Sequence, residues 1–311
     1  MLVRTIKPIF LISLPRSGST LLQKILMSNK DVASHAEPWF VLPLLYGMKT
    51  QGIKTEYGQN QAFNAINNIC KSLPNGRDDY EAEIKSIILG IYSKLAKGRH
   101  YFLDKTPRYY FILDDLHRLF PDAKFIYLFR SPVSVFSSMV EAFRDNSMRR
   151  FDYLDNDLYI GPKNIAKSYI EHKDSSFLIR YEELVCEPEK YLISLCEYLE
   201  IEFEPKMITD FILQEINGQG DSLGAKRYKT LSNNSDKWKS MINTKYRKKR
   251  LYKYIEKIDI NYLNIGQYNK MNLLEEINKL EVDFKPKEYF YGFEEGMIKI
   301  LKKIVNYNTI A

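Results

Sequence analysis

Residues 9–22, IFLISLPRSGSTLL, decide how this chain is interpreted. The apolar run 9–14 is typical of a buried strand, and a loop of Pro, Arg, Ser and Gly then leads into an apolar-periodic helix. A glycine-containing loop between a strand and a helix directs backbone N–H groups, at the positive end of the helix dipole, toward a ligand. The stretch therefore predicts an anion site at Ser17–Thr20.

The loop departs from the ATP-binding pattern GxxxxGK[ST] at two positions. Gly18 and Thr20 match, but Ser13 stands at the first glycine and Ser19 at the lysine. Arg16 supplies a fixed positive charge instead, and its planar guanidinium suits tetrahedral oxyanions. Two interpretations follow: a phosphate-binding loop without the lysine, or an ordinary strand–turn–helix whose Ser and Thr side chains cap the helix.

A second segment favours the phosphate-binding interpretation. Residues 130–138, RSPVSVFSS, directly follow the apolar run 124–129, KFIYLF. Arg130 would then lie at the carboxyl end of a strand, where open α/β sheets bind ligands. Ser134 and Ser138 are four residues apart, so they would share one face of the next helix. Two such anion sites fit a ligand with phosphates at both ends of a nucleoside.

Short apolar runs alternate with helical patterns along the chain. We predict strands at 9–14, 101–104, 124–129 and 176–179, and helices at 17–28, 107–119, 132–143 and 188–199, with two more in 59–97 that are interrupted at 73–76. This order predicts an α/β, P-loop-like three-layer fold, in which helices flank a central parallel sheet. Residues 144–164 are expected to form a loop or lid. The long basic helical pattern from 244 onward predicts a C-terminal helical extension, 244–311, beside a domain at 1–243.

Composition limits the classes of protein and partner. The 311 residues are 45% hydrophobic and carry a net charge of +7, which favours an anionic ligand or surface. The basic run 245–253 is interpreted first as a solvated helix face. The alternatives are that it binds an anionic substrate or makes a peripheral membrane contact. No known nucleic-acid module is present, so no nucleic-acid partner is expected. No apolar run is long enough for a membrane span.

Cysteine and histidine spacing also limits the chemistry. The three cysteines are scattered without CxxC spacing, which is typical of reduced thiols and predicts a cytoplasmic location. The four histidines show no metal-binding spacing. We therefore expect no structural metal.

Five segments in this order resemble the sulfotransferases, which use 3′-phosphoadenosine 5′-phosphosulfate (PAPS). PRSGST resembles the 5′ loop of the tyrosylprotein, carbohydrate and bacterial branches, and RSPVSVFSS resembles the second cofactor loop. Lys105 in DKTP precedes Arg130 by the spacing of the active-site lysine in the tyrosylprotein enzymes. Tyr181 in RYEELV and Lys237 in SDKWK resemble the residues beside the adenine and over the cofactor. The resemblance runs from residue 9 to residue 238.

The resemblance implies PAPS as cofactor, no metal, and sulfuryl transfer to a hydroxyl of an acceptor. It implies the following cofactor-binding residues: Arg16, Ser17, Gly18, Ser19, Thr20, Arg130, Ser138, Tyr181, Ser222 and Lys237. For catalysis it implies Arg16, with Lys105 as donor to the sulfuryl oxygens and Glu37, twenty-one residues after Arg16, as general base. His35 is the rival base, because other branches use a histidine.

Two other functions stay open. One is a small-molecule kinase that uses Mg-ATP, with Asp104 as its only plausible metal-binding acid. The other is a non-catalytic nucleotide-binding protein. The expected acceptor is a carbohydrate or another small molecule, with aromatic residues of 38–46 and 144–164 on the substrate side. No sequence pattern indicates whether the protein is a monomer or an oligomer.

Overall fold

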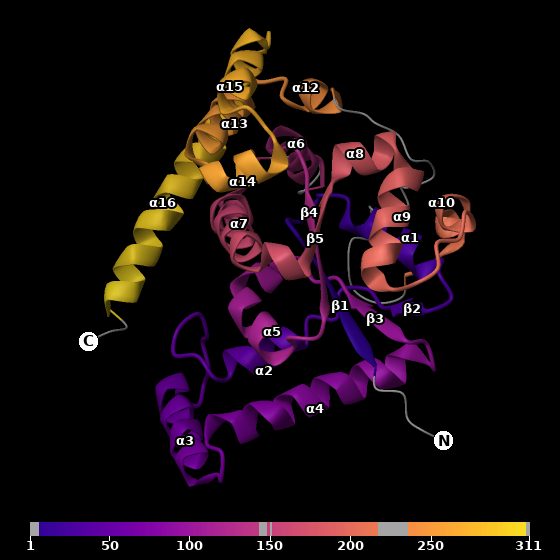
Figure 1. Cartoon of the computed structure of the whole chain (residues 1–311). Helices are drawn as coiled ribbons and strands as arrows, with labels where there is room; N and C mark the ends of the chain where they lie inside the picture. The colour runs from indigo at the N-terminus through magenta and orange to yellow at the C-terminus, as the bar shows by residue number, and fades with distance from the viewer. Residues whose placement is uncertain (1–5, 143–147, 150, 217–235, 309–311) are drawn as a thin grey trace.

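The computed structural model describes residues 6–142, 148–149, 151–216 and 236–308. A five-stranded parallel sheet forms its centre, in the order β2-β3-β1-β4-β5 (Figure 1). The strands are β1 (Lys7–Ser13), β2 (Val32–Ser34), β3 (Tyr101–Asp104), β4 (Lys124–Phe129) and β5 (Ser176–Arg180). β1 is central and pairs with β3 on one side and β4 on the other. All five carboxyl ends therefore meet at one edge of the sheet.

Helices cover both faces of the sheet, because successive strand residues point to opposite sides. Ile9 and Leu11 of β1 belong to one buried cluster, and Phe10 and Ile12 belong to the other. The first cluster is covered by α1 (Ser19–Met27), α8 (Tyr181–Cys186), α9 (Pro188–Leu199) and α10 (Lys206–Thr209), on the right of the sheet in Figure 1. The predicted three-layer architecture is thus confirmed.

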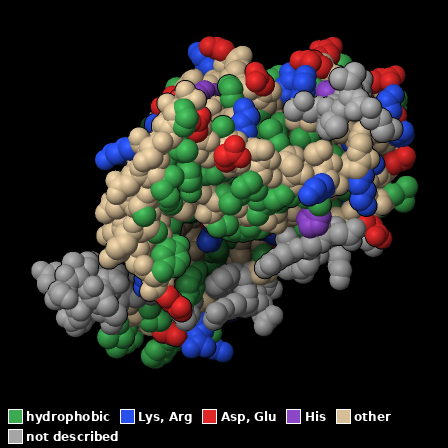
Figure 2. All heavy atoms as spheres, turned by 90° about the horizontal axis from the view of Figure 1, so that it is seen from below, with side chains coloured by type: hydrophobic (Ala, Val, Ile, Leu, Met, Phe, Trp, Pro, Cys, Tyr) green, Lys and Arg blue, Asp and Glu red, His purple; other side chains and the backbone are tan. Residues whose placement is uncertain are grey.

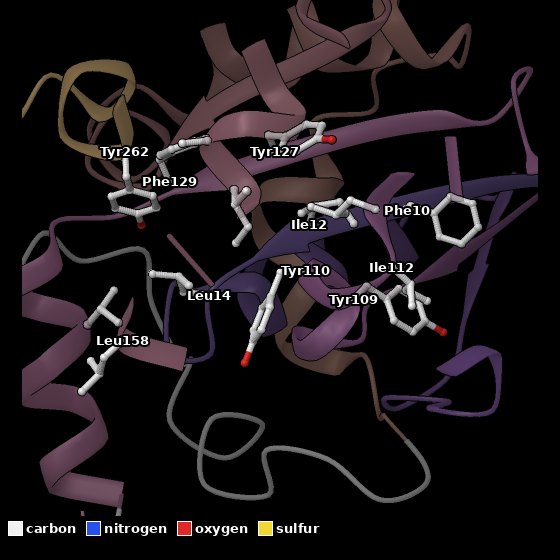
Figure 3. Packing of buried hydrophobic residues seen from close by; sticks show 14 of the residues in the cluster. Phe10, Ile12, Leu14, Tyr109, Tyr110, Ile112, Tyr127, Phe129, Leu158 and Tyr262 are labelled. Carbon is white, nitrogen blue, oxygen red and sulfur yellow. The ribbon is translucent and has the colours of Figure 1, made fainter. Parts of the chain in front are cut away.

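The second face carries a larger, aromatic-rich cluster. Figure 3 shows Phe10, Ile12, Tyr109, Tyr127 and Phe129 packed along the strands. This face is covered by α2 (Val41–Tyr46), α4 (Arg77–Ala96), α5 (Leu113–Leu119), α6 (Pro132–Ala142) and α7 (Gly161–His172). Two helices from the C-terminal part, α13 (Lys245–Lys257) and α14 (Ile260–Gly266), also cover it. α3 (Gln59–Ser72) packs beside α4 at the bottom of Figure 1, and the predicted interruption at 73–76 separates them. Figure 2 shows the molecule from below. Hydrophobic side chains gather across the middle of this surface, around a hollow that holds Lys or Arg side chains.

Three expectations about local structure were wrong. A fifth strand, β2, had not been predicted, since three residues are too few for a periodic signal; it pairs with β3 at the sheet edge. The predicted helix 107–119 is a 3-10 helix, Pro107–Phe111, followed by α5, because Ile112 has φ −133° and ψ 20°. This break lets both Tyr109 and Ile112 turn inward, where each is almost fully buried.

The predicted loop or lid at 144–164 is also wrong for its described part. Residues 151–154 form a 3-10 helix, 156–160 a π-helical turn, and α7 begins at Gly161. Phe151 and Leu158 are buried in the aromatic-rich cluster. Burial of these two side chains holds the segment against the body as helical turns.

The C-terminal part is helical, as expected. It contains α12 (Lys237–Met241), α13 (Lys245–Lys257), α14 (Ile260–Gly266), α15 (Lys270–Lys279) and α16 (Pro286–Asn308), the last of which runs to the C-terminus in Figure 1. Tyr254 and Tyr262 are buried in the same cluster as Phe10 of the central strand. The domain boundary at 243/244 stays a prediction. Within the described ranges, no helix has the length and apolar character needed to cross a bilayer.

Candidate active site

The loop after β1 is shaped by two residues with positive φ. Gly18 has φ +91° and Arg16 has φ +69°. The ring of Tyr181 lies against Gly18 so closely that a Cβ at position 18 would overlap it. Only glycine satisfies both the backbone angle and this contact. Gly18 is also the N-cap of α1, so it has no side chain to occupy the N–H groups of the first turn, which includes Ser19 and Thr20.

The two predicted anion-binding segments meet directly, although they lie more than a hundred residues apart in sequence. Arg16 Nε donates to Ser138 Oγ at 3.2 Å. Arg130, at the end of β4, donates through a terminal nitrogen to the carbonyl oxygen of Arg16 at 3.0 Å. The Arg130 side chain thus reaches across to the first loop. Both arginines belong to one continuous site at the carboxyl edge of the sheet.

Tyr181 connects these two segments. Its ring centre lies 4.2 Å from the guanidinium carbon of Arg130, a stacked cation–π contact, and its edge faces Gly18. Nε of Arg130 is buried and has no hydrogen-bond partner among the described residues. A buried donor on a cation usually has an acceptor. This nitrogen is therefore a candidate contact for an anionic ligand.

A polar recess opens beside the first loop. Lys105 follows β3 and Glu37 follows β2, and Lys105 Nζ lies 2.8 Å from Glu37 Oε1. Glu37 Oε2 also accepts a hydrogen bond from Trp39 Nε1 at 3.1 Å. Glu37, one partner of this ion pair, thus follows β2, the strand that the sequence patterns did not predict. The recess is lined by Pro15, Arg16, Gly18, Ser19, Thr20, Glu37, Lys105 and Pro107.

Asp104 lies behind this recess and is fully enclosed. Its Oδ2 accepts hydrogen bonds from the hydroxyls of Tyr92 at 2.5 Å and Tyr109 at 2.7 Å, and its Oδ1 accepts one from Thr106 at 2.9 Å. Burial raises the pKa of Asp104, and the three hydroxyl donors oppose that shift. Asp104 therefore orders the turn that carries Lys105, and its oxygens are already occupied by hydroxyls.

The other expected residues are placed less centrally. His35 does not line the recess, and its Nδ1 lies 3.2 Å from the carbonyl oxygen of Ala36. Ser17 is fully buried beneath the loop. Lys237 forms an ion pair with Glu141, at the far end of α6 from Arg130. Ser222 lies outside the described residues. Within those residues, no group of three or more His, Cys, Asp or Glu side chains could hold a metal ion.

Sequence reasoning missed three residues near Arg130. Glu182 and Tyr262 contact the loop that follows β4, and Tyr268 bonds to Glu182, as described below. Glu182 lies in the quoted segment RYEELV, but nothing in that pattern separates it from an ordinary surface carboxylate. The two tyrosines lie in a part of the chain without a motif. Gly266 just before Tyr268 is the one local signal, since glycine near a helix end predicts a turn.

A sequence model described as "Sulfotransferase family" matches residues 8–205, which is more than half of the 311 residues. The chain belongs to the sulfotransferase family. The match contains Arg16, Glu37, Lys105 and Arg130 and ends before α12.

Two individual relatives match parts of this chain. Nodulation protein NoeE of Sinorhizobium fredii is 34% identical over 134 residues, covering 42% of this chain and 30% of that protein. Protein-tyrosine sulfotransferase 1 of Danio rerio is 28% identical over 201 residues, covering 62% of this chain and 53% of that protein. The matches therefore span less than a third of the first relative and about half of the second.

Two solved sulfotransferase domains share the fold. The domain from the curacin biosynthetic pathway aligns with a TM-score of 0.53 and 21% identity, over 86% of this chain and 99% of that chain. The domain from the Synechococcus PCC 7002 olefin synthase aligns with a TM-score of 0.51 and 20% identity, over 85% and 94%. At these identities the likeness concerns the fold alone.

Proposed function

We propose that this protein transfers the sulfuryl group of PAPS to a hydroxyl of a carbohydrate or another small molecule. The observation that carries the proposal is the Lys105–Glu37 pair, at 2.8 Å, in a recess bounded by Arg16 and the start of α1. A cation and a carboxylate that face one anion site are what in-line transfer to a hydroxyl requires. Family membership supports the reaction class.

The residues fit a nucleotide with phosphates at both ends. The first turn of α1 and Arg16 would hold the 5′ side, since helix N-termini and guanidinium groups bind phosphate. Arg130, with its buried unpaired Nε, and Ser138 would hold the 3′-phosphate. PAPS, when bound, supplies an activated sulfuryl group joined to its 5′-phosphate. Tyr181 would contact the nucleotide from the Gly18 side of the loop.

The catalytic groups have complementary tasks. Arg16 and the α1 N–H groups stabilise negative charge that develops on the 5′-phosphate side, and they are oriented before reaction begins. Lys105 donates hydrogen bonds to oxygens of the transferred group. Glu37 accepts the proton of the acceptor hydroxyl. Glu37 is the better base than His35, because Glu37 lines the recess and His35 does not.

An exposed aromatic residue lies beside the proposed base. Trp39 is 38% exposed and donates its indole N–H to Glu37, so its ring lies beside the proposed base. An exposed indole next to the acceptor hydroxyl suits stacking against a sugar ring or another flat molecule. Tyr153, which is 48% exposed, belongs to the other segment expected on this side. A carbohydrate acceptor is therefore the first to test.

Asp104, the residue expected to bind metal in a kinase, is not available for that role. Asp104 is fully buried and its oxygens accept three hydroxyl hydrogen bonds, so it cannot reach a magnesium ion without breaking that cluster. Ser19 also replaces the lysine of an ATP-binding loop. Non-catalytic nucleotide binding is the remaining alternative. It predicts tight nucleotide binding without transfer to any acceptor.

The decisive experiment combines binding with transfer. Calorimetric titration should give tighter binding of 3′-phosphoadenosine 5′-phosphate (PAP) than of ADP with magnesium. Radiolabelled PAPS is then incubated with the protein and fractions of a carbohydrate-rich lysate, and the labelled product is identified by mass. Magnesium-dependent ATP turnover, or PAP binding without any labelled product, would contradict the proposal.

A further inference from the structure

The loop that carries Arg130 is held by residues far along the chain, beyond the part that matches the family. The hydroxyl of Tyr262, in α14, donates to the carbonyl oxygen of Arg130 at 3.2 Å. The Tyr262 ring packs against Phe129 with centroids 4.8 Å apart, and Figure 3 shows the two rings side by side. Tyr262 is only 1% exposed. It therefore fixes both the last residue of β4 and the carbonyl that follows.

A second tyrosine acts on the next residue of the loop through a carboxylate. The hydroxyl of Tyr268 donates to Glu182 Oε2 at 2.8 Å. Glu182 Oε1 accepts the backbone N–H of Ser131 at 2.9 Å. One carboxylate thus joins the C-terminal segment to the backbone just after Arg130. The neighbouring residue, Tyr181, stacks on the guanidinium itself at 4.2 Å.

The turn after α14 is built to deliver Tyr268. Gln267 adopts a left-handed conformation with φ +60°, and the N–H of Tyr268 bonds back to the carbonyl of Leu263 at 2.8 Å. A Cβ at Gly266 would overlap the Tyr268 ring. Glycine at this position thus lets the ring fold back over the end of α14. The side chain then reaches Glu182 rather than solvent.

We propose that Tyr262 and Tyr268 are positioning residues for nucleotide binding, which hold the Arg130–Ser131 backbone so that the Arg130 guanidinium faces the 3′-phosphate. This proposal rests on the proposed function, since it assigns the 3′-phosphate to Arg130. The physical reason is preorganisation: a long arginine side chain on a fixed backbone loses less freedom when its ligand binds. The C-terminal helices are therefore part of the nucleotide site.

Hydroxyl deletions test the proposal with a matched control. Tyr262→Phe and Tyr268→Phe each remove one hydrogen bond and keep the ring. Tyr254→Phe, in α13, is the control, because the Tyr254 hydroxyl is buried without a partner among the described residues. Since one hydrogen bond contributes modestly, we expect the Tyr262→Phe, Tyr268→Phe double variant to bind PAP about 10-fold more weakly. Its affinity for adenosine 5′-phosphate should change less than about twofold.

The outcomes separate positioning from general loosening. PAP affinity equal to that of the wild type, or an equal loss for both nucleotides, overturns the proposal. The Tyr254→Phe variant should bind both nucleotides as the wild type does. If the wild type prefers neither nucleotide, the proposed function fails, and a second measurement still tests the positioning.

That second measurement needs no nucleotide. Hydrogen–deuterium exchange is followed in a peptide that contains the Ser131 amide, which donates to Glu182. This amide should exchange faster in Tyr268→Phe than in the wild type or in Tyr254→Phe, because Glu182 loses the hydrogen bond from the Tyr268 hydroxyl. Identical exchange in all three proteins would show that Tyr268 does not hold the loop.

Discussion

The ammonium group of Lys105 lies 2.8 Å from the carboxylate of Glu37, and these side chains are only 3% and 11% exposed. They come from the ends of two neighbouring strands, β3 and β2. An enclosed ion pair depends on both partners, because removal of one leaves an uncompensated charge. The pair keeps a carboxylate and a cation within one hydrogen bond of each other beside the loop that follows β1.

Glu37→Gln tests the proposed general base separately from nucleotide binding. The amide keeps the shape of the side chain but cannot accept the acceptor proton. We expect the transfer rate to fall by about 10²- to 10⁴-fold, with PAP affinity retained. Single-turnover transfer from labelled PAPS measures the rate, and calorimetry measures the binding. His35→Gln is the matched variant: loss of transfer there, with normal turnover in Glu37→Gln, would move the base to His35.

Arg130→Ala tests the assignment of the 3′-phosphate. A hydrogen bond from a charged donor contributes about 1.5–3 kcal/mol, so PAP binding should weaken by about 10- to 150-fold. Adenosine 5′-phosphate lacks the 3′-phosphate, and its binding should change far less. Calorimetric titration with the two nucleotides measures the difference. Equal weakening of both would remove Arg130 from this role.

Gly18→Ala tests the contact between the first loop and Tyr181. Gly98 is a natural control, since it has nearly the same φ, +90°, but nothing near the place of an added Cβ. Gly98→Ala should cost only the left-handed backbone strain, about 1–2 kcal/mol. Gly18→Ala should cost about 1–3 kcal/mol more, because the Tyr181 ring must shift, and should weaken PAP binding. Urea unfolding and titration measure both effects, and equal costs at the two sites would contradict the contact.

His117→Gln should make stability less sensitive to acid. Burial, and then the neighbouring His172 stacked at 3.6 Å, lower the pKa of His117 to about 4, while Asp114 opposes the shift. The unfolded chain, with a pKa near 6.5, therefore binds the proton more strongly. The stability that this histidine contributes is complete above about pH 6.5 and is lost as the pH falls toward 4.

Melting temperatures from pH 7.5 to 5 measure this effect. The wild type should lose more stability over that interval than His117→Gln, whose amide can keep the bond that His117 Nε2 makes to Tyr127 at 2.9 Å. His100→Gln, which also removes one histidine but lies outside the stacked pair, is the control. Parallel curves for all three proteins would contradict the prediction.

Much of the layered fold was predictable because its signals are local. The strands at 101–104 and 124–129 and the helix at 188–199 have the predicted bounds, since each is a compact apolar or periodic run between turn residues. The three-residue strand β2 was not predictable in this way. Neither was the break at Ile112, which lets Tyr109 and Ile112 both turn into the core.

The residues of the candidate site also divide into those that a local pattern predicted and those that it did not. Arg16, Gly18 and Arg130 were found because each belongs to a short pattern next to a strand end. Glu182, Tyr262 and Tyr268 belong to no such pattern. Each is placed by a hydroxyl or carboxylate that bonds to a group 51 to 132 residues away in sequence.

The order of residues alone determined that a glycine-bearing loop would join β1 to α1 and that an arginine would end β4. Backbone angles, helix dipoles and strand alternation act over a few residues, so the local sequence specifies them. Only the tertiary structure decided that Lys105 meets Glu37, that Tyr181 lies between Gly18 and Arg130, and that the C-terminal tyrosines hold the Arg130 loop. Those relationships depend on which strands become neighbours and which helices cover them, and that packing is a property of the whole folded chain.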